Sequence, residues 1–238
     1  MKYTYLMFGY LLLFTACTTL KDLQTVETVI PCVGSVGQTK GRVFSKEFQK
    51  IGEPRISQPI AVSLQSKAFS KTSYKAYQKY RGHLGKQVSI AYNDSLAVPP
   101  RFYELRITDL VGIKNVLNQE SNNGLLHYLE DDRSLAMLTG ISFVVINRQQ
   151  QMLEEAQHLS LVQKDGHLVL QVENGMLNME IDMKSLEVFD FETSGFCWQA
   201  NKRNQPEIAV LTRNREGCPR GTEKTAAKLD ETRQYLKL

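Results

Sequence analysis

The strongest constraint on the fold of this chain is a series of three short segments separated by two Asx-Gly dipeptides. The segments are 159–162, 168–172 and 177–183, and the dipeptides between them are Asp165-Gly166 and Asn174-Gly175. Asx-Gly dipeptides supply the positive φ angles that tight hairpin turns require. In the third segment apolar and polar residues alternate, so one face of that strand is expected to be buried and the other wet. The sequence therefore predicts an antiparallel meander in the C-terminal half.

Other segments predict further strands on both sides of this meander. Alternation predicts strands at 60–69, 88–92 and 102–107, and the meander is expected to continue through 186–191, 196–200 and 208–212. The run 141–146 is continuously apolar and rich in β-branched and aromatic residues, which is typical of a strand covered on both faces. We therefore expect 141–146 to be the central strand.

Short helices are predicted between and after the strands. Residues 71–81 contain helix-forming residues without proline or glycine, and Gly82 and Gly85 follow them. The spacing of apolar residues predicts two short helices between positions 112 and 129, with a turn between them. Thr222 is placed to cap a final helix that runs to about residue 236. These elements together predict an α+β fold in a single compact domain.

The N-terminus has the composition of an export signal. Lys2 is followed by an apolar run from Tyr3 to Phe14 and then by two small residues before Cys17. A run of about a dozen residues is too short to cross roughly 30 Å of hydrocarbon as a permanent helix. We therefore expect this segment to be removed after export.

The residues Phe14-Thr15-Ala16-Cys17 resemble the lipobox of bacterial lipoproteins, with phenylalanine at the place where leucine is common. The resemblance implies cleavage before Cys17 and acylation of that cysteine, so the chain would be tethered to a membrane by its lipid. Thr18 stands where an aspartate often marks inner-membrane retention in that class, which favours the outer membrane. The alternatives are a plain secretory signal and an uncleaved anchor.

The chain is accordingly divided into a signal peptide (1–16), a tether (17–41) and a globular domain (42–238). The tether lacks a sustained apolar period and ends in a stretch with three glycines. Removal of the signal, which carries only Lys2 as a charged residue, lowers the formal net charge from +4 to +3. That charge is too mild to indicate a nucleic-acid partner.

Three cysteines remain after lipidation of Cys17. Cys197 lies in an apolar stretch and Cys218 follows another, so adjacent antiparallel strands would bring them together as a disulfide. The alternative is a pair of buried thiols. Cys32 would then be a shielded thiol, or would pair between chains, and its neighbours in sequence offer nothing that lowers its pKa.

The sequence contains no recognisable catalytic or metal-binding motif. The four histidines lie far apart, without the spacing of a metal site, and neither GxSxG nor SxxK occurs. The glycine-rich stretch 34–41 lacks the glycine-lysine-serine/threonine order of a phosphate loop. The acidic cluster 130–132 is interpreted as a solvated helix end. The sequence therefore predicts neither a metal nor a cofactor, and leaves enzymatic activity uncertain but less expected than binding.

One basic stripe is predicted on the helix at 71–81. Lys71, Lys75 and Lys79 recur at steps of four, which places them along one helix face. With Tyr74 and Tyr77 among them, such a stripe could bind lipid headgroups, phosphates or an acidic glycan. The alternative is that the lysines form an ordinary solvent-exposed helix face while the tyrosines pack inward.

A second basic group is predicted near the C-terminus. If the disulfide fixes a hairpin there, a basic patch would form from Lys202, Arg203, Arg213 and Arg215. The alternative is ordinary scatter of surface charge.

Two functional hypotheses follow. In the first, the chain is a lipid-anchored cell-envelope protein whose domain is a non-enzymatic binding or structural module for a protein or an anionic envelope polymer. In the second, it is a hydrolase of an envelope or imported polymer, with a site assembled from residues distant in sequence. A pocket with converging carboxylates, or a histidine beside Cys32, would favour the second hypothesis.

Overall fold

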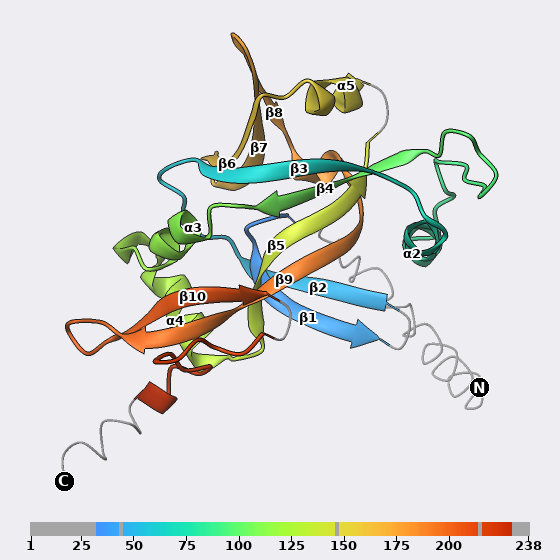
Figure 1. Cartoon of the computed structure of the whole chain (residues 1–238). Helices are drawn as coiled ribbons and strands as arrows, with labels where there is room; N and C mark the ends of the chain where they lie inside the picture. Colours follow the sequence, from blue (N-terminus) through green and yellow to red (C-terminus); the bar gives the residue numbers. More distant parts are fainter. Residues whose placement is uncertain (1–31, 43–44, 146–147, 214–215, 230–238) are drawn as a thin grey trace, which may run out of the picture.

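The structure is a computed structural model that describes residues 32–42, 45–145, 148–213 and 216–229 (Figure 1). The predicted signal, Cys17 and the first part of the predicted tether lie outside the described residues. The elements are, in chain order, β1 (Val36–Arg42), β2 (Ser45–Gly52), β3 (Ile60–Ala68), α2 (Lys71–His83), β4 (Arg101–Ile107), α3 (Leu110–Leu117), η1 (Glu120–Asn122), α4 (Asn123–Asp131), β5 (Leu135–Val144), α5 (Arg148–Glu154), β6 (His158–Lys164), β7 (His167–Asn174), β8 (Leu177–Ile181), η2 (Met183–Ser185), β9 (Glu187–Ala200) and β10 (Pro206–Arg213).

In the described part of the chain, ten strands form one antiparallel sheet. Neighbouring strands follow the order β10-β9-β5-β4-β3-β6-β7-β8, while β1 pairs with β5 and with β2. An architecture of antiparallel strands with a few short helices is therefore confirmed, although not every predicted element is present. The α+β description needs one adjustment, because strand clearly exceeds helix in these residues.

β5 is the central strand, as its apolar composition predicts. It pairs with β9 along one edge and with both β4 and β1 along the other. Its residues are buried with two exceptions, Ala136 and Ser142. The strand begins at Leu135, earlier than expected, because its first residues pair with β1.

The meander formed by β6, β7 and β8 is confirmed, together with both tight turns. Asp165 and Gly166 have φ angles of 49° and 81°, which allows a two-residue connection between β6 and β7. In the second turn only Gly175, at 59°, has a positive φ, because the loop consists of Gly175 and Met176 rather than of the Asx-Gly pair.

The predicted continuation of this meander is wrong. After β8 the chain turns through η2, where the Asp182 side chain accepts a hydrogen bond from Lys184 N (2.9 Å), and it then runs to the far side of β5. Met183 and Leu186 are buried on the way, so the apolar core draws the chain across instead of letting it pair again with β8. The two segments expected at 186–191 and 196–200 form one long strand, β9.

The strand predicted at 88–92 is also wrong, since these residues form a loop. Side chains of α2 bind its polar groups: Tyr74 Oη donates to Ile90 O (2.9 Å), and Ser89 N donates to Tyr77 Oη (3.1 Å). The loop backbone is thereby satisfied without a neighbouring strand.

The fold begins before the predicted boundary at residue 42. Cys32, Val33 and Val36 are buried, and Gly34 N donates to Leu138 O (2.8 Å). Gly37 permits a close pairing of β1 with β2, because a Cβ atom there would lie 2.2 Å from the backbone oxygen of Gln49 in β2. Residues 32–41 are therefore part of the sheet and core, and Gly34 and Gly37 serve close packing rather than a flexible tether.

Two apolar clusters lie on opposite faces of the sheet. Neighbouring residues of a strand point to opposite faces, so Tyr103 joins the main core while Phe102 joins a second core. Phe143 and Val144 divide in the same way on β5. The main core lies against α3 and α4, and the second lies beneath α2, which packs against the start of β9.

The final helix predicted from Thr222 does not begin there. Thr222 Oγ1 donates to Pro219 O (2.7 Å), and Glu223 forms an antiparallel β-bridge with Trp198. This segment therefore pairs with β9 instead of starting a helix. Helical residues appear only at 228 and 229, and residues 230–236 lie outside the described part.

Candidate binding surfaces

α2 presents the predicted lysine stripe on a well-defined helix. A capping box starts the helix: Ser70 Oγ accepts from Ser73 N (3.2 Å), and Ser73 Oγ accepts from Ser70 N (2.8 Å). Lys71, Lys75 and Lys79 are all exposed. The structure therefore brings these three predicted residues together on one face.

The two tyrosines of the stripe do not belong to this surface, which corrects the predicted site. Tyr77 is fully buried and Tyr74 is 9% exposed. Both rings lie 5.7 Å from the ring of Phe69 in the second core. Burial of a large ring is favourable, and the helical period turns these positions toward the sheet while the lysines turn away. The tyrosines hold α2 in place and cannot contact a partner.

A polar network fixes the helix at the edge of this core. Glu187 of β9 accepts a hydrogen bond from Tyr77 Oη (3.0 Å) and from Ser89 Oγ (3.0 Å). Arg81 forms an ion pair with the same carboxylate (3.3 Å). Burial raises the pKa of the Tyr77 hydroxyl, which therefore stays protonated and donates at neutral pH. α2 is thus held by apolar packing and by hydrogen bonds to β9.

The second predicted basic group is divided by the structure. Lys202 and Arg203 lie together and exposed in the turn between β9 and β10. Asn201 Oδ1 shapes this turn by accepting from Arg203 N (2.8 Å). Arg213 is exposed at the other end of β10, and the eight residues of that strand separate it from the turn by roughly 20 Å. Arg215 lies outside the described residues. The described members therefore do not form one patch.

The two basic groups lie at opposite ends of the molecule. α2 packs near Glu187, the first residue of β9, whereas Lys202 follows its last residue, Ala200. A strand of this length spans roughly 45 Å. Figure 1 shows α2 at one end and the β9–β10 turn at the other. A single small ligand could not contact both groups.

A polar hollow of about 660 Å³ lies beside the β9–β10 turn. Lys202 and Arg203 line it, together with the carboxylates Glu120 and Glu207. The nearby Asn118 side chain accepts from Ile208 N (2.9 Å) and donates to Ile208 O (2.8 Å), so it joins α3 to β10. Charges of both signs line this hollow, which makes it less selective for anions than the lysine stripe.

A smaller hollow of about 220 Å³ lies on the sheet surface over β4, β5 and β9. Arg106 reaches Glu104 and Glu192, with nitrogen–oxygen distances of 3.3 Å to each. Gly140 leaves room for the arginine, since a Cβ atom there would lie 3.2 Å from Arg106 Cγ. Strand alternation places Glu104 and Arg106 on one face and could have indicated this cluster. Sequence reasoning missed it because the neighbouring strand was unknown.

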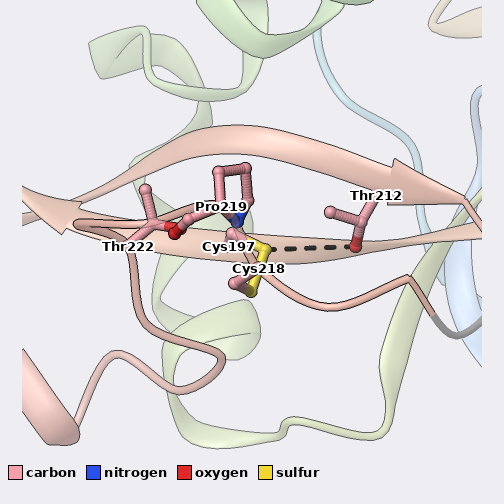
Figure 2. The surroundings of a disulfide bond; sticks show 5 residues. All are labelled: Cys197, Thr212, Cys218, Pro219 and Thr222. Atoms are coloured by element: carbon pink, nitrogen blue, oxygen red, sulfur yellow. Dashed lines mark hydrogen bonds between the residues drawn. A yellow bond between two sulfur atoms is a disulfide. The ribbon is translucent and has the colours of Figure 1, made fainter.

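The predicted disulfide between Cys197 and Cys218 is confirmed (Figure 2). It joins β9 to the segment that follows β10, with Thr212 of β10 close to the Cys197 sulfur (4.0 Å). The same segment pairs with Trp198 through Glu223. The disulfide therefore fixes the C-terminal segment against the edge of the sheet.

Cys32 is a buried thiol, as its apolar neighbours suggest. It is 3% exposed, and burial, with the nearby Glu53 carboxylate, raises its pKa to about 11. Glu53 accepts a hydrogen bond from Ser35 Oγ (3.3 Å) and pairs with Lys50. A thiol in this environment stays protonated and is a poor nucleophile.

Histidines pair with single carboxylates at separate places. His83 contacts Glu47 (3.2 Å) and His127 contacts Glu130 (3.3 Å). Within the described ranges, no group of three or more histidine, cysteine, aspartate or glutamate side chains could hold a metal ion. The same residues include no helix with the length and apolar character needed to span a membrane.

Comparison of the chain with known protein families, with curated proteins and with solved structures gave no match.

Proposed function

We propose that this protein is a lipid-anchored component of the bacterial cell envelope, held through Cys17 at the outer membrane, whose domain binds an anionic envelope component. The observation that carries the proposal is the exposed row Lys71, Lys75 and Lys79 on one face of α2. The domain acts in this proposal as a binding or structural module. The expected lipobox supports the location, and the lysine row supports the chemistry of the partner.

The way in which α2 is fixed in the fold strengthens the interpretation of its lysines as a binding surface. An isolated basic helix loses conformational freedom when it binds, whereas α2 is already fixed by Tyr74 and Tyr77 in the second core. The helix itself contains no aspartate or glutamate. A phosphate- or carboxylate-bearing partner would therefore meet a preformed positive surface.

The binding proposal is tested with a soluble polyanion, dextran sulfate, at low ionic strength. The variant Lys71→Gln/Lys75→Gln/Lys79→Gln is expected to bind at least tenfold more weakly, because each lysine near an anionic surface contributes about 1 kcal/mol. The matched control replaces three exposed lysines that are scattered over the chain, namely Lys40, Lys184 and Lys224, by glutamine. Both variants lose the same charge, so equal binding by the two would refute the α2 surface.

The tether is tested separately by intact mass and fractionation of the native protein. Wild type is expected to begin at an acylated Cys17 and to sediment with membranes, and the Cys17→Ala variant is expected to lose both properties. An unmodified or uncleaved wild-type product would refute the lipid anchor.

A hydrolase is the alternative function, and one observation favours it. Glu104, Asp190 and Glu192 converge on the smaller hollow, as a pair of catalytic carboxylates would. Arg106 occupies the space between two of them, which suits an ion-pair network better than an acid and a base. Polymer hydrolysis by the wild type that is lost in Glu104→Gln or Glu192→Gln would establish the alternative.

A further inference from the structure

The loop that follows α2 exposes several large apolar side chains. Val98 is 84% exposed, Leu96 45% and Val88 41%. Large apolar side chains scattered singly on a surface need no explanation, but these three belong to one loop, residues 84–100. The loop therefore offers an apolar edge that its own domain does not bury.

Contacts along its first half join this loop to α2. Tyr74 Oη donates to Ile90 O (2.9 Å), and the rings of Tyr74 and Tyr92 lie 4.9 Å apart. Arg81 donates through Nε to Gln87 O (2.8 Å). Figure 1 shows the loop next to α2 at the same end of the molecule. The loop that carries the apolar side chains is thus held against the helix that carries the lysines.

The charge of this unit is strongly positive. Residues 70–100 contain five lysines and arginines but only one acidic residue, Asp94. Asp94 accepts a hydrogen bond from Tyr92 (2.6 Å), and two of the basic side chains in the segment, Arg81 and His83, pair with carboxylates of β9 and β2. The exposed lysines Lys71 and Lys75 lie on the face of α2 turned away from the sheet.

We infer that α2 and the loop 84–100 dock on a lipid bilayer with anionic headgroups. The lysines lie against the headgroup phosphates, while Leu96 and Val98 enter the apolar boundary beneath them. A soluble polyanion would satisfy the lysines but would leave these side chains in water, whereas a bilayer offers negative charge and apolar depth together. This inference rests on the proposed function and names the partner of the same surface.

The lipid anchor would favour this contact. Residues 17–31 could span at most about 50 Å when extended, so the domain would stay close to the bilayer that holds the acyl chains. Such confinement raises the effective concentration of the docking surface, and even a weak second contact is then populated. The docked domain would lie with α2 facing the membrane.

The inference is tested by vesicle co-sedimentation with the mature chain carrying Cys17→Ala, so that no acyl chain holds the protein. The probes are vesicles of phosphatidylglycerol with phosphatidylethanolamine, and vesicles of phosphatidylcholine alone. The Leu96→Ser/Val98→Ser variant is expected to bind the anionic vesicles about tenfold more weakly than the parent. The matched control Met176→Ser/Leu177→Ser changes two exposed apolar residues at the β7–β8 turn and is expected to bind like the parent.

Parallel binding to dextran sulfate separates the two proposals. If the surface docks on a bilayer, the Leu96→Ser/Val98→Ser variant keeps its affinity for dextran sulfate and loses affinity for vesicles only. Unchanged vesicle binding by this variant overturns the bilayer inference, and lysine-dependent binding to dextran sulfate then leaves the proposed function standing. Vesicle binding that survives Lys71→Gln/Lys75→Gln/Lys79→Gln overturns the bilayer inference, and dextran sulfate binding that survives the same substitutions overturns the proposed function.

Discussion

Loss of the disulfide is expected to destabilise the domain by an amount that follows from its position. The bridge joins residues 21 positions apart, Cys197 in β9 and Cys218 beyond β10. The perturbation is the double variant Cys197→Ala/Cys218→Ala, made in a Cys17→Ala background. A single substitution is unsuitable because it would leave an unpaired thiol that could pair with Cys32 or with another chain.

The magnitude follows from chain entropy and from what else holds the segment. A closed loop of about 20 residues restricts the unfolded chain by about 3 kcal/mol. Trp198 and Glu223 still exchange two backbone hydrogen bonds without the bridge (2.7 and 2.8 Å), and Ala226 remains buried in the main core. The segment is therefore expected to stay folded in the variant, so the cost appears in the global free energy of unfolding.

Urea unfolding followed by the fluorescence of Trp198 measures this cost. The chain has one tryptophan, it is 2% exposed, and it lies next to the disulfide. A loss of about 3 kcal/mol lowers the midpoint by about 1 M or more. The parent in reductant is the control, because it keeps both sulfur atoms and loses only the covalent link. A midpoint within about 0.3 M of the parent would refute the expectation that the bridge closes a loop that folds with the sheet.

Three further predictions concern the N-terminal part of the fold. Because its pKa is raised to about 11, the Cys32 thiol is expected to resist alkylation in the native Cys17→Ala protein at pH 8 and to react once unfolded; rapid native reaction would contradict its burial. Because the thiol is harder to ionise in the folded state, the stabilisation that the protonated Cys32 side chain provides is complete below the ordinary thiol pKa and is lost as the pH rises through about 11. Urea unfolding of the parent and of Cys32→Ala over a series of alkaline pH values would measure this loss. Gly37→Ala is expected to destabilise the domain by several kcal/mol, because its Cβ would overlap the backbone of β2, whereas Gly41→Ala meets no atom within 4 Å and serves as its control in thermal unfolding; equal melting temperatures would contradict the close pairing.

Local patterns predicted the parts of the candidate site that depend on one element. Steps of four in sequence placed the lysines on one face of a helix, and the helix formed as expected because Ser70 caps it and no breaker interrupts it. The same period left two alternatives for Tyr74 and Tyr77, an exposed and a buried position. Only the presence of Phe69 and the sheet beneath the helix decided that they are buried.

The conformation of the loop 84–100 and the cluster of Glu104, Arg106 and Glu192 depend on neighbours that lie far away in sequence. Alternation at 88–92 resembled a strand, but no facing strand was available in the fold, and the tyrosines of α2 satisfied the backbone instead. Glu104 and Glu192 meet only because β4 and β9 flank β5. The order of strands was therefore needed before either surface could be recognised.

The sequence by itself determined the elements whose signals are local: the β6–β7–β8 meander with its turns, the helix α2, the apolar central strand and the approach of Cys197 to Cys218. Each depends on alternation, spacing or turn residues within a few tens of positions. Only the tertiary structure decided that β9 crosses to the far side of β5, that residues 32–41 belong to the sheet and that the basic residues form separate groups. Pairing between distant strands is selected by how the whole apolar core is buried, and this information is not carried by any single segment.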